Sequence, residues 1–200
     1  MGEKKPDRSA VPDAEIVQVV LAGEIDAFDE LVRRTRRPAY RLARRITRNH
    51  EDADDVVQDS YVKAYRALPQ FDPGRPFQPW FLTIVARSAL SQIRQRARKA
   101  TVPLDEPGAD GTTLADRISD VPPDPLARQR LIDVEEALVS LPEEQRAVLA
   151  LRVDGDLPYA EIAIALDVPV GTVMSRLARA REALLEEVEK RRAERFRRSS

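Results

Sequence analysis

Four polar side chains in the C-terminal third of the chain have the types and spacing of a DNA-reading helix. These side chains are Thr172, Ser175, Arg176 and Arg179. Between them, the apolar Val170, Val173 and Leu177 recur every three or four residues, which is the spacing of one helical face. A helix with this pattern buries one face and presents a polar, basic face to a partner. Arginine can bond guanine through two hydrogen bonds, and serine or threonine can reach bases or phosphates. The pattern therefore predicts a helix that contacts the DNA major groove.

A second helix is predicted immediately before this one, with a short turn between them. The residues on its apolar face are Tyr159, Ile162, Ala163 and Leu166. Asp156 is expected to cap its N-terminus, and Pro158 is tolerated in a first turn. Pro169 and Gly171 then interrupt the periodicity. Two helices joined by a tight turn are typical of a helix-turn-helix, and an ordinary helical hairpin with a solvated charged face is the alternative.

The composition indicates an all-α protein. Charged residues make up 34% of the 200 residues and aromatics only 5%, so the core must consist chiefly of Leu, Val, Ile and Ala. There is no cysteine and one histidine, His50, which argues against disulfides and against thiolate or histidine zinc sites. No apolar run approaches the roughly 18 residues that a membrane span requires, and the first residues do not resemble a signal peptide. We expect a cytoplasmic protein without membrane insertion, metal or cofactor.

The first half of the chain predicts a helical domain over residues 13–100, preceded by a flexible leader over residues 1–12. A short amphipathic helix is expected to end at Gly23. A second helical segment begins near Glu24, and Pro38 is expected to kink or divide it.

The sign of the charge reverses between the second and third predicted helices. Eight arginines and no acid lie between residues 33 and 48. This run is either a solvated face or a surface for a polyanion or an acidic protein. The acids that open the next helix are Glu51, Asp52, Asp54, Asp55 and Asp59. The helix macrodipole favours acids in a first turn, and without EF-hand spacing we expect no metal site here.

An aromatic loop and a basic helix are predicted next. The loop, residues 69–80, contains four prolines and a glycine together with Phe71, Phe77 and Trp80. Loop aromatics either stack on unpaired bases or fill the domain core, and for Trp80 we favour the core. The charged residues of the following helix are all basic: Arg87, Arg94, Arg96, Arg98 and Lys99. A helix without acidic partners favours phosphate binding.

Residues 101–125 are predicted to form a flexible, acidic, proline-rich linker. The segment holds five prolines, two glycines, six acids and one arginine. It precedes a second small helical domain over residues 126–190, which contains the helix-turn-helix. Residues 191–200 form a basic tail that we expect to fray. A linker of this length allows two domains to contact separate parts of one ligand.

Four segments together resemble the bacterial RNA polymerase sigma factors of the extracytoplasmic-function (ECF) class within the sigma-70 family. They are DADDVVQDSYVKAYRAL, FLTIVARSAL after a loop ending in PW, LPEEQRAVLALRV and YAEIAIALDVPVGTVMSRLARAREAL. The resemblance covers about residues 14–100 and 126–188, and VPVGTVMSRLARARE is highly specific for the class. It implies a promoter-specificity subunit of RNA polymerase without catalytic activity of its own.

The resemblance also implies partners and residue roles. The chain would bind the clamp and flap of core RNA polymerase, and the residues implied in this binding are Arg41, Asp52, Asp55, Gln58 and Asp59. The residues implied in melting and reading the −10 element are Arg75, Phe77, Gln78, Trp80, Arg87, Ser88, Ser91 and Gln92. The −35 element would be read by Thr172, Ser175, Arg176 and Arg179. The linker would pass through polymerase channels, and an anti-sigma factor would hold the protein inactive.

Three positions depart from the family pattern. Met174 stands where lysine or arginine is usual, which removes a phosphate or base contact. Asp167 replaces a common glycine at the turn, where a left-handed backbone is expected and aspartate tolerates it better than most residues. Arg87 stands where asparagine is common. These departures leave the preferred promoter sequence open.

Two other functions fit parts of the sequence. A stand-alone helix-turn-helix regulator would bind duplex DNA without polymerase and would not need the aromatic loop. A metal-dependent nucleic-acid enzyme would use the carboxylates Asp52, Asp54, Asp55 and Asp59, and chelation would abolish its hydrolysis. The scarcity of histidine counts against the enzyme, and the sigma-factor interpretation accounts for both domains.

Overall fold

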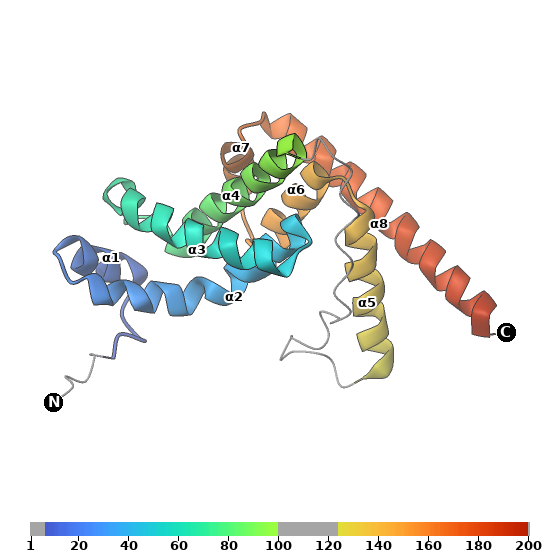
Figure 1. The fold of residues 1–200 in the computed structure, drawn as a ribbon, viewed down its shortest axis with the longest axis horizontal. Coiled ribbons are helices and arrows are strands. Elements are labelled where there is room, and N and C mark those ends of the chain that lie inside the picture. The colour runs from blue at the N-terminus through green and yellow to red at the C-terminus, as the bar shows by residue number, and fades with distance from the viewer. Residues whose placement is uncertain (1–6, 100–123, 200) are drawn as a thin grey trace.

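A computed structural model describes residues 7–99 and 124–199 of the chain. In these ranges all regular secondary structure is helical, with two helical bodies packed against each other (Figure 1). The prediction of an all-α protein is confirmed. The leader up to residue 6 and nearly all of the predicted linker, residues 100–123, lie outside the described residues. None of the described helices combines the length and the apolar character needed to cross a bilayer.

The N-terminal body is built on three long helices that pack on one another. In chain order its elements are α1 (Asp13–Leu21), the 3-10 turn η1 (Ile25–Ala27), α2 (Phe28–Thr47), α3 (His50–Ala67), the 3-10 turn η2 (Leu68–Gln70) and α4 (Phe77–Lys99). Apolar residues at helical spacing meet in one core, which includes the fully buried Leu31, Leu42, Ile46, Phe77 and Phe81. The predicted end of the first helix is confirmed, since α1 stops before Gly23, whose φ is 108°.

Pro38 does not divide the second helix. α2 runs without interruption from Phe28 to Thr47 with Pro38 inside it, so of the expected kink or division the division is wrong. Thr35 and Ala39 on either side of the proline are buried, and the Thr35 hydroxyl donates to the Leu31 carbonyl at 2.6 Å. Packing on both sides of the proline holds the helix together despite the hydrogen bond that proline cannot make.

The loop before α4 is shorter than predicted. α4 begins at Phe77, so Phe77, Gln78 and Trp80 belong to its first turn and not to a loop. Pro79 is tolerated there because the first amides of a helix have no partner within the helix. The irregular part is restricted to residues 71–76, where the Asp72 carboxylate accepts from the Gly74 amide at 2.9 Å.

The C-terminal body consists of α5 (Pro125–Ser140), α6 (Glu143–Val153), α7 (Tyr159–Leu166) and α8 (Val170–Ser199). Asp124 caps α5, and its carboxylate accepts from the Leu126 and Ala127 amides at 3.0 and 3.3 Å. The expectation that Asp156 caps α7 is wrong. Pro158 occupies the N-cap, and Asp156 has a positive φ of 48° and pairs with Arg152 at 2.9 Å.

The basic tail continues α8 as a helix up to Ser199, so the expected fraying of this end is wrong. Figure 1 shows the C-terminal half of α8 projecting from the body of the molecule, and α5 is one of the helices that α8 contacts. Arg195 forms an ion pair with Asp133 of α5, whose side chain is buried. The hydrogen bond from Arg195 lowers the pKa of Asp133. This contact between the two helices explains why the tail stays helical.

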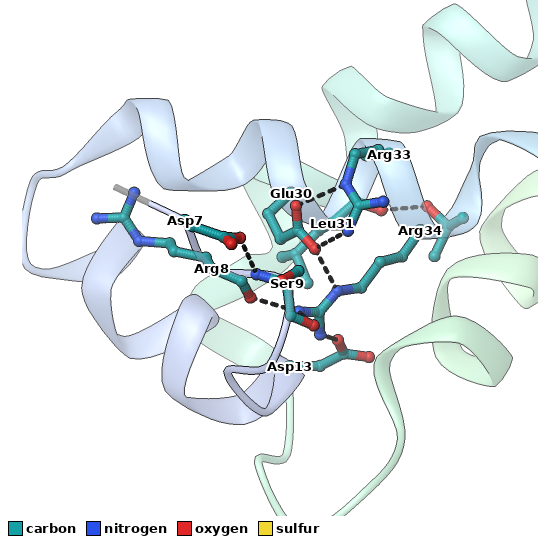
Figure 2. Close-up of polar contacts among 9 residues, drawn as sticks. Asp7, Arg8, Ser9, Asp13, Glu30, Leu31, Arg33 and Arg34 are labelled. Carbon is teal, nitrogen blue, oxygen red and sulfur yellow. Dashed lines mark hydrogen bonds and ion pairs between the residues drawn. The ribbon is translucent and has the colours of Figure 1, made fainter. Parts of the chain in front are cut away.

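The segment before α1 is attached to α2 through the Arg34 guanidinium (Figure 2). Arg34 donates to the Asp13 carboxylate at 2.5 Å and to the carbonyls of Arg8 and Ser9 at 2.7 and 3.1 Å. It also donates to Glu30 at 2.7 Å, and Arg33 donates to the same carboxylate at 2.8 and 2.5 Å. These hydrogen bonds, first of all those from Arg33, lower the pKa of Glu30 from 4.5 to about 2.

A Glu30→Gln variant is expected to lose about 1 kcal/mol of unfolding free energy at pH 7, the range of a partly exposed ion-pair network. Because the folded pKa lies below the unfolded value, the stabilisation is complete above about pH 5 and is lost as the pH falls towards about 2. Urea unfolding of both proteins at a series of pH values measures this. A difference between them that does not shrink on acidification would contradict the prediction.

Candidate nucleic-acid interface

The two helices of the predicted helix-turn-helix are α7 and α8, and the turn between them has the expected backbone. Asp167 follows α7 with φ 54° and ψ 52°, so the left-handed conformation expected at this position is confirmed. The Val168 amide donates to the Ala163 carbonyl at 3.1 Å, which closes the end of α7. The Thr172 amide then donates to the Pro169 carbonyl at 2.9 Å and starts α8.

One face of α8 is buried and the other is open to solvent. Val173, Leu177 and Ala180 are buried against the rest of the C-terminal body. Gly171, Ser175 and Ala178 are exposed, and a rotation of about 100° per residue places them on the opposite side of the helix. Val170 was expected to pack, but it is 43% exposed, so this expectation is wrong.

The four predicted −35 residues lie in the first three turns of α8, and two of them are exposed. The Ser175 hydroxyl donates to the Thr172 carbonyl at 3.0 Å. Arg179 is exposed and its Nε donates to the Ser175 carbonyl at 3.3 Å. Arg176 is only 19% exposed and pairs with Glu144 of α6 at 2.5 Å. Arg179 and Ser175 are thus the members that face solvent most directly.

The three aromatic residues around the short loop form a cluster and do not project from the surface. Phe77 is fully buried and Phe71 is 6% exposed. Trp80 packs on both, with ring centroids 5.1 Å from Phe71 and 5.4 Å from Phe77. The core role favoured for Trp80 is therefore confirmed in part, since its side chain is half-buried against the core. Arg75 on the loop is exposed and Gln78 is half-buried.

The other predicted −10 residues lie along α4 in different environments. Ser91 is exposed, and Ser88 is buried and accepts from Lys63 of α3 at 2.9 Å. Gln92 donates to the Asp52 carboxylate at 2.7 Å. Arg87 is engaged by the second body, because its guanidinium donates to the carbonyls of Ala165 and Ile164 at 2.8 and 2.5 Å. These carbonyls belong to the last turn of α7, where helical hydrogen bonds run out.

The predicted polymerase-binding residues separate into an exposed group and one buried member. Asp55, Gln58 and Asp59 are exposed on α3, and Arg41 is exposed on α2. Asp52 is 4% exposed and faces α4, where it also forms an ion pair with Arg96. In this conformation Asp52 holds α3 to α4.

Contacts between the two bodies were not predicted from the sequence. Arg45 of α2 pairs with Asp154 at 2.8 Å and with Glu135 at 3.1 Å. Burial raises the pKa of Asp154 even with this arginine beside it. Arg146 of α6 is 3% exposed and donates to the Leu141 carbonyl at 2.9 Å, while burial lowers its pKa to about 10. The two partners of Arg45 lie far from it in the sequence, and no local pattern signals these contacts.

Arg146 also reaches the first body. Its guanidinium donates to the Val139 and Ile46 carbonyls, each at 3.3 Å. The Ile46 carbonyl is in the last turn of α2. Arg146 therefore donates hydrogen bonds to carbonyls at the C-terminal ends of both α5 and α2.

Comparisons with known proteins identify both bodies. Residues 31–99 match the family model Sigma-70 region 2, and residues 131–184 match Sigma-70, region 4. The chain is 39% identical over 173 residues to the ECF RNA polymerase sigma factor SigM of Mycobacterium tuberculosis, covering 86% of this chain and 82% of the relative. It is 29% identical over 172 residues to the ECF RNA polymerase sigma factor SigW of Bacillus subtilis, covering 84% and 92%.

Two solved structures share the fold over most of the chain. One is the sigma factor RpoE in complex with the anti-sigma factor NepR from Bartonella quintana, with a TM-score of 0.62, 25% identity and coverage of 81% of this chain and 96% of that chain. The other is CnrH in complex with the cytosolic domain of CnrY, with a TM-score of 0.60, 27% identity and coverage of 89% and 97%. The exposed face of α8, the two domain matches and the relatives agree, and the chain therefore belongs to the ECF sigma factors of the sigma-70 family, which direct promoter-specific initiation of transcription by RNA polymerase.

Proposed function

We propose that this sigma factor reads the −35 element with α8 and the −10 element with α4 and the loop before it. The observation that carries the −35 assignment is the solvent-facing side of α8, with Ser175 and Arg179 opposite a buried apolar face. Thr172 and Arg176 lie at its edge. The N-termini of recognition helices supply the residues that reach base edges in helix-turn-helix proteins.

On the −10 side, the exposed Arg75 and Ser91 and the half-buried Gln78 are the groups available to DNA in this conformation. The buried Phe77 and the packed Trp80 hold the loop in place through their contacts with Phe71. Ser88, Gln92 and Arg87 reach DNA only after their present contacts are exchanged. Extruding a base costs a few kcal/mol, so contacts with the extruded base beside a basic helix would favour local melting.

Core polymerase is the proposed partner of the exposed acidic side of α3, formed by Asp55, Gln58 and Asp59, and of Arg41 on α2. The proposed domains span residues 13–100 and 126–190. In the first domain, the buried Asp52 would support this polymerase-binding surface from below, without contacting polymerase directly in this conformation. We assign the chain no catalytic activity of its own and place it in the cytoplasm with the polymerase. An anti-sigma partner is proposed because both structural neighbours are bound to a second protein, and in one of them that protein is an anti-sigma factor bound to a sigma factor.

Run-off transcription with core polymerase on a genomic promoter library tests the function directly. Discrete transcripts that depend on this chain and share two upstream elements are expected. A chain that binds duplex DNA specifically but neither joins the core nor starts any transcript would instead support a stand-alone regulator.

An Arg179→Ala variant is expected to reduce initiation at −35-dependent promoters by roughly 5- to 150-fold, equivalent to about 1–3 kcal/mol for a lost base contact. Arg176→Ala should act in the same direction. Arg197→Ala, at the far end of the same helix, is the matched control and should leave transcript yield unchanged. Equal yields from wild type and Arg179→Ala at subsaturating protein would remove Arg179 from the contacts.

The two bodies are expected to separate when polymerase binds, because Arg87 cannot contact the −10 element while it donates to α7. The chain contains no cysteine, so dyes can be attached to Gln95→Cys on α4 and Ala160→Cys on α7. Energy transfer between them should fall when core polymerase is added. A pair within one body, Gln95→Cys with Arg66→Cys, should show no change. Constant transfer in the first pair would contradict the separation.

A further inference from the structure

The exposed side of α8 is asymmetric across its width. Its centre carries the small residues Gly171, Ser175 and Ala178, which leave room for close approach to a groove. At about 100° per residue, Arg179 lies on one flank of this strip and Met174 on the other. The polar flank is accounted for by the proposed −35 contacts. The flank that carries Met174 is not.

The Met174 flank is apolar and open. Met174 is 54% exposed, and Val170, one helical turn earlier, is 43% exposed. Residues four positions apart on a helix are neighbours, so these two side chains form one apolar edge in the first turns of α8. The methionine thioether accepts hydrogen bonds only weakly, and valine has no polar side-chain atom. This edge cannot read a base through strong hydrogen bonds.

The major groove offers one apolar feature to such an edge, which is the C5-methyl group of thymine. Adenine, guanine and cytosine present amino, carbonyl and ring-nitrogen groups there. If one of these groups faced Met174, it would lose water without gaining a hydrogen bond, which disfavours binding.

We propose that Met174, supported by Val170, selects a thymine in the −35 element through contact with its C5-methyl group. The inference rests on the assignment of α8 to the −35 element. Met174 is then a specificity-determining residue of this sigma factor, and the base pair that it faces is read by shape and apolar contact.

Deoxyuridine substitution tests the proposal, because it removes only the methyl group of thymine. The assay uses holoenzyme reconstituted from core polymerase and the full chain, on a promoter selected with the wild-type protein. Each −35 thymine on either strand is replaced by deoxyuridine in turn. At one position, initiation by the wild type should fall by about three- to fivefold, the expected effect of one lost methyl contact. A Met174→Ala holoenzyme should be insensitive to the same replacement.

Two further variants sharpen the result. Met174→Arg should shift the preferred base at that position towards guanine, which arginine can bond bidentately. Leu185→Ala removes another exposed apolar side chain further along α8, 61% exposed against 54% for Met174, and it should keep the full deoxyuridine effect. The proposal is overturned if no thymine is sensitive, or if Met174→Ala retains the wild-type sensitivity. Failure of the wild type to initiate from any promoter would instead count against the function itself.

Discussion

A Gly155→Ala variant is expected to lose about 2–4 kcal/mol of unfolding free energy through steric overlap in a packed site. A Cβ atom at this position would lie 2.5 Å from Cδ1 of Leu157 and 2.7 Å from the carbonyl oxygen of Leu151. Leu157 is fully buried, and the Leu151 carbonyl is fixed because it accepts from the Leu157 amide at 3.2 Å. Neither group can move without disturbing the connection between α6 and α7. Chemical denaturation of the full chain measures the loss.

Gly171→Ala is the matched control. A Cβ atom there meets nothing within 4 Å, and the residue lies in the first turn of α8. Alanine has the higher helix propensity, so stability should stay constant or rise by up to about 1 kcal/mol. If both variants were equally stable, the proposed steric clash at Gly155 would be wrong.

An Arg146→Ala variant is also expected to lose about 2–4 kcal/mol of unfolding free energy, because the substitution leaves buried carbonyls without hydrogen-bond donors. The guanidinium serves three carbonyls, those of Leu141 at 2.9 Å and of Val139 and Ile46 at 3.3 Å. The first two belong to the end of α5, and the third belongs to α2 in the other body. The variant should therefore weaken both the C-terminal body and its contact with the N-terminal body.

Arg181→Ala is the control for the loss of an arginine, since Arg181 is exposed on α8. Its effect on stability should stay within about 0.5 kcal/mol. Urea unfolding followed by circular dichroism compares the two variants with the wild type. An Arg146→Ala protein as stable as the control would show that water replaces the guanidinium at these carbonyls.

The helices themselves could be predicted from local pattern. The periodicity of Val173 and Leu177 located α8, and the left-handed backbone expected at Asp167 is present. Errors arose where packing overrides local preference. Pro38 was expected to kink or divide α2, and buried neighbours keep the helix undivided.

The candidate site could be predicted in part. Residue types and spacing placed Ser175 and Arg179 on an exposed face, as the structure shows. They did not indicate that Phe77 would be fully buried or that Asp52 would face α4. Both side chains are suited to a ligand by type, and only packing decides whether they point towards the core or the solvent. The exposure of Val170 was missed for the same reason.

The sequence by itself determined the all-α class, the helix-turn-helix and the family, because helical periodicity and local motifs depend on residues close together in the chain. Only the tertiary structure decided which polar groups are free to bind. The contacts of Arg87 with α7, of Arg45 with Asp154 and of Arg146 with Ile46 join residues from the two separate bodies. Such contacts depend on the relative placement of whole helices, which a short window of sequence does not determine.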